Sequence, residues 1–461
     1  MNKKSLLTAA GLGLVGLTSA QADNPLNLPN IVLILADDLG YGDLTCYGST
    51  KHRTPRLDQM ANEGIRFTDF YATAPVCSPT RASLMTGSYP QRVGLASGEG
   101  NSVVIFPEDK IGLNTNETTI AEVLKARGYE TMIIGKWHLG DQPSFMPNVH
   151  GFDTYFGLPS SNDHYTGRDG KDYYPMPLML NGTVLETEPD QALLTARFTE
   201  EAVSFIEANT NTPFFLYLAH EYVHTPWFPS HKFMTNTTQG AYAAEVEQLD
   251  YETGVILDTL KSLGLDTNTL VIFTSDNGST ITGSNLPLRG RKGQTWEGGM
   301  REPCVMQWTG TIPSNTVSSA LCSVMDMLPT FANISGGTLS ANTIDGYDIT
   351  DIMTGTSSTS PYAAFYYYGT SDHKLNAVRS GKWKLHIDPA NELYDLDADI
   401  GESSNVYGSN PSVVSSLTAL ADLIIADIGG DDGTDGPNVR PAGYVASPVG
   451  IAPRDQSNLC D

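Results

Sequence analysis

Two pairs of polar side chains stand directly after apolar runs of the sequence. Asp37 and Asp38 follow "IVLILA", and Asp276 and Asn277 follow "LVIFTS". Such runs predict buried strands, and in an open α/β sheet ligands gather beyond the carboxyl ends of the strands. Four hard oxygen donors without sulfur or imidazole favour calcium or magnesium over zinc, and flexible ligation suits calcium. The alternative is that each pair only caps a loop or turn.

The stretch "APVCSPTRASLMTG", which ends at Gly87, predicts a helix with a thiol just outside its start. Ser78 is a good N-cap, Pro79 suits the first helical position, and glycine suits the far end. Cys77 then lies beside the positive end of the helix dipole, with Arg81 one turn in. From these residues alone, Cys77 is a nucleophile of lowered pKa, half of a disulfide, or an inert packed thiol.

The elements that must position these residues alternate along the first three-quarters of the chain. Apolar runs alternate with amphipathic patterns, which is typical of a mostly parallel sheet wrapped by helices. The predicted strands cover residues 30–36, 129–135, 213–219 and 269–275. The predicted helices include residues 118–128, 195–209 and 240–263.

The pattern changes near residue 350. A Ser-, Thr- and Gly-rich hinge is followed by the short runs "YAAFYYYG", "NAVRSGKWKLHID" and "NELYDLDAD", which predict a small antiparallel sheet. A late helix is predicted at 415–429, with a loop-like tail after it. We therefore expect an α/β domain that carries the chemistry over residues 23–355, and a C-terminal α+β subdomain over residues 356–461.

The first 22 residues are expected to be a signal peptide outside the fold. Lys3 and Lys4 precede the short apolar run "LLTAAGLGLVGL", and "AQA" fits a small-residue cleavage site. That run is too short to span a membrane, and no later span is predicted. The expected location is periplasmic or secreted, with an uncleaved anchor as the alternative.

The net charge of −25 restricts the classes of molecule that the chain is expected to bind. A surface this acidic repels polyanions at long range, so no nucleic-acid partner is expected. A pocket for an anionic substrate must then be a local positive island, and salt would screen the rest of the surface. Solubility alone also accounts for such a charge.

The five cysteines are Cys46, Cys77, Cys304, Cys322 and Cys460. Export favours disulfides, but an odd number leaves one thiol over whatever the pairing, and Cys77 is the candidate. Cys304 and Cys322 are either a disulfide or two buried free thiols.

The pattern Cys-x-Pro-x-Arg, here "CSPTR" followed by "ASLMTG", resembles the signature of the type I sulfatases. The blocks "ILADDLGYGDLTCYG", "GKWHLG", "PFFLYLAHEYVHTP", "SDNG" and "LRGRKGQTWEGGMREP" also resemble sulfatase blocks, in the order of that family. The resemblance runs from about residue 28 to about residue 405 and points to the arylsulfatase-A-like family. It implies the alkaline phosphatase-like α/β fold, a large mostly parallel mixed sheet sandwiched by helices.

The resemblance also implies the chemistry. Cys77 would be oxidised to Cα-formylglycine by a formylglycine-generating or anaerobic sulfatase-maturating enzyme. One hydroxyl of the hydrated aldehyde would attack sulfur to form a covalent sulfo-enzyme, and the other would later collapse that ester. The implied reaction is sulfuric ester hydrolysis with calcium, or magnesium in its place. The implied metal ligands are Asp37, Asp38, Cys77, Asp276 and Asn277.

The implied catalytic residues are Cys77, Arg81, Lys136, His138, His224 and Lys292. Lys136 would stabilise negative charge on the formylglycine oxygen, and His138 would take the proton from the second hydroxyl. These two residues are two apart, so on an extended segment their side chains point the same way. His224 and Lys292 would bind sulfate and protonate the leaving alcohol, with His220 as the alternative to His224. Arg301 is expected to make a structural ion pair.

Substrate contacts are predicted on loops. By alignment with the family block, Ser161 in "GLPSSNDH" contacts sulfate. The aromatic-rich segments "DHYTGRDGKDYYP" and "YYYGTSDHKL" offer His164, Arg168 and His373 to hydroxyls or further sulfates, although ordinary surface loops have the same composition. Export, acidity and these loops point to a sulfated polysaccharide or oligosaccharide, such as the marine galactan carrageenan.

Two other functions stay open. One is a phosphatase or phosphonate monoester hydrolase on the same fold, which a second divalent metal with added Asp and His ligands would favour. The other is a non-catalytic protein that binds sulfated glycans, if Cys77 stays a thiol. No redox or nucleotide cofactor is implied, and no particular oligomeric state is predicted.

Overall fold

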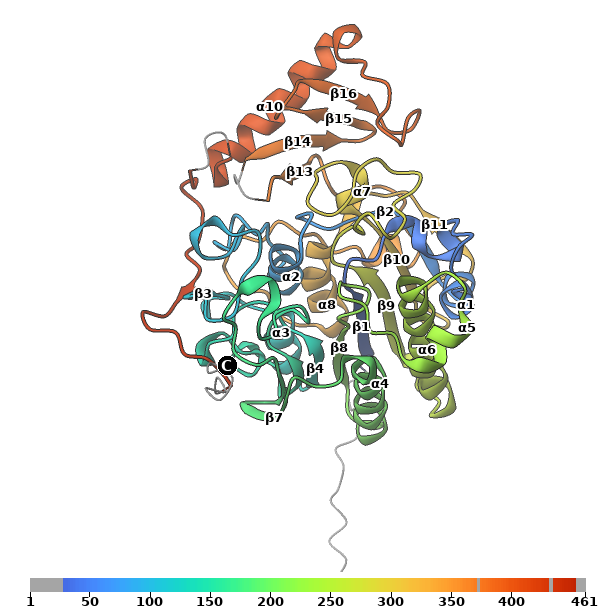
Figure 1. Cartoon of the computed structure of the whole chain (residues 1–461). Coiled ribbons are helices and arrows are strands. Elements are labelled where there is room, and N and C mark those ends of the chain that lie inside the picture. The colour runs from blue at the N-terminus through green and yellow to red at the C-terminus, as the bar shows by residue number, and fades with distance from the viewer. Residues whose placement is uncertain (1–27, 371–373, 431–433, 453–461) are drawn as a thin grey trace, which may run out of the picture.

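The structure, a computed structural model, describes residues 28–370, 374–430 and 434–452. An 11-stranded sheet forms the larger part of the protein, and a four-stranded antiparallel sheet forms the C-terminal part (Figure 1). This architecture confirms the predicted fold class. The predicted signal peptide, His373 and Cys460 lie outside the described residues.

The large sheet has a parallel centre with antiparallel flanks. Its main path runs β11 (Thr316–Ser318), β2 (Ile65–Tyr71), β10 (Arg301–Gln307), β9 (Thr269–Ser275), β1 (Asn30–Ala36), β8 (Phe214–Ala219), β4 (Glu130–Lys136), β5 (Thr154–Leu158), β6 (Pro177–Leu180) and β7 (Thr183–Thr187). β12 (Cys322–Ser323) pairs with β2, and β3 (Ile111–Gly112) pairs with β17 (Gly443–Tyr444). The strands from β9 to β5 are mutually parallel, whereas β10, β6 and β7 run antiparallel to their neighbours.

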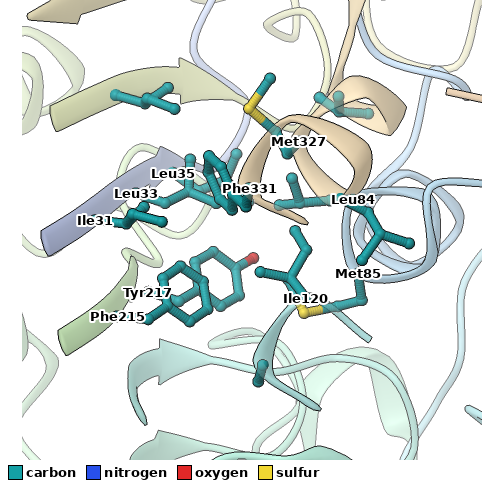
Figure 2. Close-up of a cluster of buried hydrophobic side chains, with 14 of the residues drawn as sticks. Ile31, Leu33, Leu35, Leu84, Met85, Ile120, Phe215, Tyr217, Met327 and Phe331 are labelled. Carbon is teal, nitrogen blue, oxygen red and sulfur yellow. The ribbon is translucent and has the colours of Figure 1, made fainter. Parts of the chain in front are cut away.

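Helices cover both faces of this sheet. One face packs against α2 (Cys77–Thr86), α3 (Ile120–Lys125), α8 (Met327–Ser335) and α9 (Thr350–Met353). The other packs against α1 (Pro55–Glu63), α4 (Gln191–Ala208) and α6 (Ala241–Ser262). Successive side chains of a strand point to opposite faces, so Ile31, Leu33 and Leu35 of β1 join the first core (Figure 2), and Val32 and Ile34 join the second. Two short helices, α5 (His231–Asn236) and α7 (Glu297–Met300), stand in loops.

The predicted elements are present with small differences at their ends. β1 and β9 have the predicted bounds, and β4 and β8 start one residue later than predicted. α4 starts before the predicted range because the Asp190 carboxylate caps it, accepting a hydrogen bond from the Ala192 N–H at 3.1 Å.

The predicted start of α2 is wrong by two residues. Val76 is the N-cap and Cys77 is the first residue of the helix, so the thiol lies in the first turn rather than outside it. The Ser78 hydroxyl does not cap the helix; it accepts a hydrogen bond from the Ile105 N–H at 3.2 Å instead. Gly87 ends the helix as predicted, in the left-handed conformation that glycine tolerates.

The C-terminal part is the predicted antiparallel sheet covered by one helix. Its strands are β13 (Phe365–Tyr368), β14 (Leu375–Ser380), β15 (Trp383–His386) and β16 (Glu392–Asp395), and the helix is α10 (Pro411–Ile428). By length and composition alone, α10 is apolar enough to cross a membrane, which the sequence analysis did not predict. Leu417, Ala421, Ile424 and Ile428, at helical spacing, are buried in the core of this sheet, which is typical of a helix that covers a sheet.

Candidate active site

The parallel strands at the centre of the sheet bring polar residues to one edge. In sheet order, residues at or just beyond the strand ends are Asp276 after β9, Asp37 and Asp38 after β1, His224 after β8, Lys136 of β4 and Ser161 after β5. Carboxyl ends of parallel strands meet at the same edge of a sheet, which is where α/β proteins bind ligands. The structure therefore places the residues of five separate blocks of sequence side by side.

Cys77 reaches this edge from the first turn of α2. Its side chain is buried, and its Sγ lies 3.5 Å from Asp37 Oδ1 and 3.5 Å from Lys292 Nζ. Burial raises the pKa of the thiol well above its usual range, Asp37 raises it further, and Lys136 and Lys292 offset only part of this. The lowered-pKa thiol considered from the sequence is therefore wrong, and so is the disulfide, because Cys77 is free.

Three cations surround the thiol and the carboxylates. The Arg81 guanidinium lies 2.8 Å from Asp276 Oδ2 and 3.3 Å from Asp37 Oδ2. Lys136 Nζ pairs with Asp37 and donates to Ser161 Oγ at 3.1 Å. Lys292 Nζ lies 2.7 Å from Asp38 Oδ1. Three positive charges are thus gathered at this edge, where the carboxylates Asp37, Asp38 and Asp276 balance them. The local positive island expected for an anionic substrate stays a prediction.

The buried carboxylates of the cluster differ in their electrostatics. Burial alone would raise the pKa of Asp37, but the charges of Lys136, His224 and Arg81 outweigh it and hold that pKa below its ordinary value. For Asp276, burial and the charge of Asp37 raise the pKa to about 6, with Arg81 opposing. Asp37 is thus the firmly ionised acid at the centre of the cluster.

The oxygen atoms at this edge fit a hard divalent cation. Asp37, Asp38, Cys77 and His224 each place one potential ligand atom within 4.8 Å of the others. Asn277 donates its Nδ2 to Asp38 Oδ1 at 2.8 Å, while its buried Oδ1 meets no donor among the described residues. Carboxylate and amide oxygens are ligands that calcium and magnesium prefer. His224 was not predicted as part of this set, and Asp276 joins it through the Asp38 N–H, which donates to its Oδ1 at 3.2 Å.

His138 lies in the site, but its backbone conformation differs from the extended one that was predicted. Its φ of 63° takes the chain out of the extended conformation, so the same-side argument from Lys136 is wrong. The ring Nε2 lies 3.0 Å from the Ile105 carbonyl, which can only accept, so Nε2 carries the proton. Nδ1 has no partner among the described residues, and burial lowers the pKa of the ring well below its ordinary value. A neutral imidazole with a free acceptor nitrogen suits a proton acceptor.

His224 is held by two residues that the sequence analysis left without a role. Its Nδ1 lies 3.1 Å from Asn162 Oδ1, while Asn162 Nδ2 donates to Gln191 Oε1 at 3.2 Å. Gln191 Nε2 returns a bond to the Asn162 carbonyl at 3.0 Å. This pair fixes the amide so that its oxygen faces His224, which gives the proton to Nδ1 in the neutral ring. His224 Nε2 is then directed toward Asp38, 3.8 Å away.

The alternative histidine, His220, is placed differently. It is fully buried, and neither ring nitrogen has a hydrogen-bond partner among the described residues. Burial lowers its pKa to about 3, so it is neutral. His220 shares none of the cluster contacts that His224 makes, which favours His224 as the active-site histidine.

The predicted substrate contacts are unevenly placed. Ser161 touches Lys136, as described above. His164 Nδ1 and Ser160 Oγ share a hydrogen bond of 2.6 Å, and the His164 ring lies against the rings of Phe106 and Tyr173. Arg168 lies farther out, partly exposed, with its guanidinium 3.8 Å from Asp163.

Comparison with known proteins agrees with this geometry. The family model described as Sulfatase matches residues 29–337, and a model described as N-sulphoglucosamine sulphohydrolase, C-terminal, matches residues 291–423. The chain is 38% identical to arylsulfatase A of Homo sapiens, covering 85% of this chain and 87% of that protein. It is 39% identical to N-acetylgalactosamine-6-sulfatase of Canis lupus familiaris, covering 83% of this chain and 74% of that protein.

Solved structures agree as well. The structure of Ps i-CgsB in complex with k-i-k-neocarrahexaose superposes with a TM-score of 0.77 at 31% identity, covering 86% of this chain and 92% of that chain. The PsFucS1 sulfatase from Pseudoalteromonas sp. superposes with a TM-score of 0.78 at 28% identity, covering 87% and 90%.

Proposed function

The chain belongs to the sulfatase family and is a sulfuric ester hydrolase of type I, and we propose that it removes sulfate from a sulfated galactan or its oligosaccharides, such as carrageenan. We further propose that Cys77 acts after conversion to formylglycine and that the acidic cluster holds calcium. The observation that carries this proposal is that Lys292 reaches the buried Cys77, while Arg81 and Lys136 both pair with Asp37, which Cys77 also contacts.

The buried thiol supports the conversion. A thiol whose pKa is raised by burial is a poor nucleophile at neutral pH, so unmodified Cys77 has little chemistry to offer. Formylglycine hydrate in its place supplies two hydroxyls, one to attack sulfur and one to release the product. We propose that a formylglycine-generating or anaerobic maturating enzyme makes this change during export of the chain.

The residues around position 77 divide the remaining work. Asp37, Asp38, Asp276 and Asn277 would hold calcium, whose positive charge polarises the nucleophile and one sulfate oxygen. Lys136, Lys292 and Ser161 would bind the other sulfate oxygens, and Arg81 would keep the carboxylates in register.

Two histidines would move the protons. His224, held by Asn162 at Nδ1, would act as the imidazolium and donate its Nε2 proton to the oxygen of the leaving sugar, so that the S–O bond breaks to give a neutral alcohol and a neutral ring. His138, with its free Nδ1, would accept the proton of the second hydroxyl when sulfate is released. The two imidazoles are thus suited to opposite directions of transfer.

A sugar substrate is supported by relatives and by the loops beside the site. A similar structure carries a neocarrahexaose, and another relative is named as an N-acetylgalactosamine-6-sulfatase. Next to the site, Phe106 and Tyr173 stack with centroids 6.2 Å apart, and both lie against His164. Such aromatic surfaces suit a sugar ring. Arg168 would contact groups farther from the scissile ester, and His373, outside the described residues, stays a predicted substrate contact.

The proposal is tested with matured protein and a panel of defined substrates. The panel holds carrageenan oligosaccharides, N-acetylgalactosamine 6-sulfate, 4-nitrophenyl sulfate and 4-nitrophenyl phosphate, and free sulfate is measured by ion chromatography. We expect sulfate release from the carrageenan oligosaccharides. Turnover of the phosphate ester alone would contradict the sulfatase activity, and release only from the aminosugar would contradict the galactan substrate.

Replacing Asn162 by alanine is expected to slow sugar sulfates far more than activated aryl sulfates. The variant frees the His224 ring, so a poor leaving group loses its aligned proton donor, at about 10- to 100-fold in kcat. 4-Nitrophenyl sulfate, whose leaving group needs little protonation, should change by less than about 3-fold. An equal loss on both substrates would show that Asn162 supports the fold and not the proton donor.

A further inference from the structure

The segment that carries Lys292 runs between the central sheet and the C-terminal sheet. Figure 1 shows α7, at the end of this segment, below and to the right of β13, on the side of the larger part that faces the C-terminal sheet. The Lys292 N–H donates to the Ser279 carbonyl, and the Gly293 N–H donates to the Pro75 carbonyl at 2.8 Å. The central part of the segment is thus held by its own domain, whereas both flanks are held by the C-terminal part.

Arg289 holds the flank before Lys292. Its Nη1 donates to the Glu402 carbonyl at 2.7 Å and to Tyr394 Oη at 3.3 Å. Its guanidinium also lies 3.6 Å from the centre of the Trp296 ring, a cation–π contact that closes the segment on itself. Both hydrogen-bond partners of Arg289 belong to the C-terminal part.

Lys384 of β15 holds the flank after Lys292. Its Nζ donates to the Thr295 carbonyl at 2.9 Å and lies 2.9 Å from Glu297 Oε1 and 3.0 Å from Glu402 Oε1. The lysine and both glutamates are fully buried. Glu402 Oε2 also accepts a hydrogen bond from the Glu297 N–H at 2.8 Å. A hydrogen bond from the main chain thus adds to the ion pairs between the two parts of the protein.

Aromatic packing reinforces the same flank. The Trp296 and His386 rings lie 4.1 Å apart at 35°, and His386 Nε2 contacts Glu402 Oε1 at 2.9 Å. The Trp296 ring, four residues after Lys292, therefore packs against β15.

Six buried charges form the joint, which we call the Glu297 cluster: Asp69, Glu297, Arg301, Arg379, Lys384 and Glu402. The predicted structural ion pair of Arg301 is present here, 2.7 Å from Asp69. Three acids and three bases balance, so removal of one base leaves a buried carboxylate short of a partner. The cluster therefore behaves as a unit, and it holds the segment in one position.

We propose that the C-terminal sheet positions Lys292 for catalysis, with Lys384 and Arg289 as the positioning residues. The inference rests on the proposed role of Lys292 in binding sulfate. Lys384 touches the chain three residues after Lys292, and Arg289 stands three residues before it. A displacement of the lysine by about 1 Å would lower the rate on the order of 10²-fold.

The test is a double-mutant cycle on matured full-length protein, with kcat/KM for 4-nitrophenyl sulfate as the readout. Lys384→Met is expected to lower kcat/KM by about 10- to 100-fold in the wild-type background. In a Lys292→Ala background the same change should cost less than about 3-fold, because the residue it positions is gone. Equal losses in both backgrounds would overturn the proposal.

Two further variants keep the test decisive. Lys382→Met is the matched control, because Lys382 pairs with Asp395 at 2.6 Å on the exposed side of the same hairpin, and it should leave kcat/KM unchanged. If Lys384→Met does not fold, the cycle is run with Arg289→Ala, whose side chain is on the surface and which should show the same dependence on Lys292. A Lys292→Ala protein with full activity would contradict the role of Lys292 itself, whereas lowered but measurable activity with additive losses would overturn only the positioning.

Discussion

Replacing Cys77 by serine is expected to limit the enzyme to a single turnover. Serine offers one hydroxyl at the start of α2, so it can accept sulfate but has no second hydroxyl to expel it. We expect steady-state turnover to fall on the order of 10³-fold or more, with at most about one equivalent of alcohol released per enzyme. Rapid-quench kinetics with a fluorogenic aryl sulfate measures the burst, and mass spectrometry of the peptide detects sulfate on residue 77.

Cys46→Ser is the matched control, because Cys46 is a free thiol whose neighbour is Asp58 rather than the cations of the site. This variant should keep wild-type turnover. Steady-state turnover by Cys77→Ser within about 10-fold of the matured enzyme would contradict the formylglycine mechanism.

Removing divalent cations from the matured protein is expected to abolish most of its activity. Asp37, Asp38 and Asp276 are buried at the strand ends, and the buried Asn277 Oδ1 meets no donor among the described residues. Without a bound cation, the charges of Arg81, Lys136 and Lys292 are taken up by ion pairs with these carboxylates, so less positive charge is left for the sulfate group. We expect EGTA treatment to lower kcat on the order of 10³-fold, and added calcium to restore it.

Asn277 and Asn268 stand at opposite ends of β9, and their variants compare a proposed metal ligand with a structural residue. Asn277→Ala, at the carboxyl end, is expected to raise the calcium concentration needed for half-activity by about 10- to 100-fold. Asn268→Ala, at the other end, loses only a bond to the Leu28 carbonyl and should leave the calcium dependence unchanged. Calcium titrations of activity compare the two. Full activity in EGTA, or equal dependence for both variants, would contradict the calcium site.

The elements of the central sheet were predictable because their signal is local. Runs such as residues 30–36 and 269–275 are apolar on both alternating faces over most of their length, which is typical of a strand buried on both faces. The acids that follow these two runs were predictable for the same reason. The division at residues 355 and 356 stays a prediction.

The identities of the site residues were predictable from motifs, but their states were not. Cys77 stands at a helix start that should favour a thiolate, yet complete burial outweighs that effect. The two free thiols Cys304 and Cys322 were likewise an open choice until the fold placed them on strands at either side of β2. Desolvation depends on everything packed around a group, and the local sequence contains only a small part of that surrounding.

Sequence alone thus determined the fold class, the four central strands β1, β4, β8 and β9, and the family of the chain. Tertiary structure decided which side chains meet: Asn162 with His224, and Lys384 with the segment of Lys292. Neither pair has a spacing or a motif that marks it, because 62 residues separate the first and the second joins β15 of the C-terminal sheet to a loop of the larger part. Contacts of this kind arise only when separate elements pack together, since hydrogen bonds and buried charges depend on distance in space and not on position along the chain.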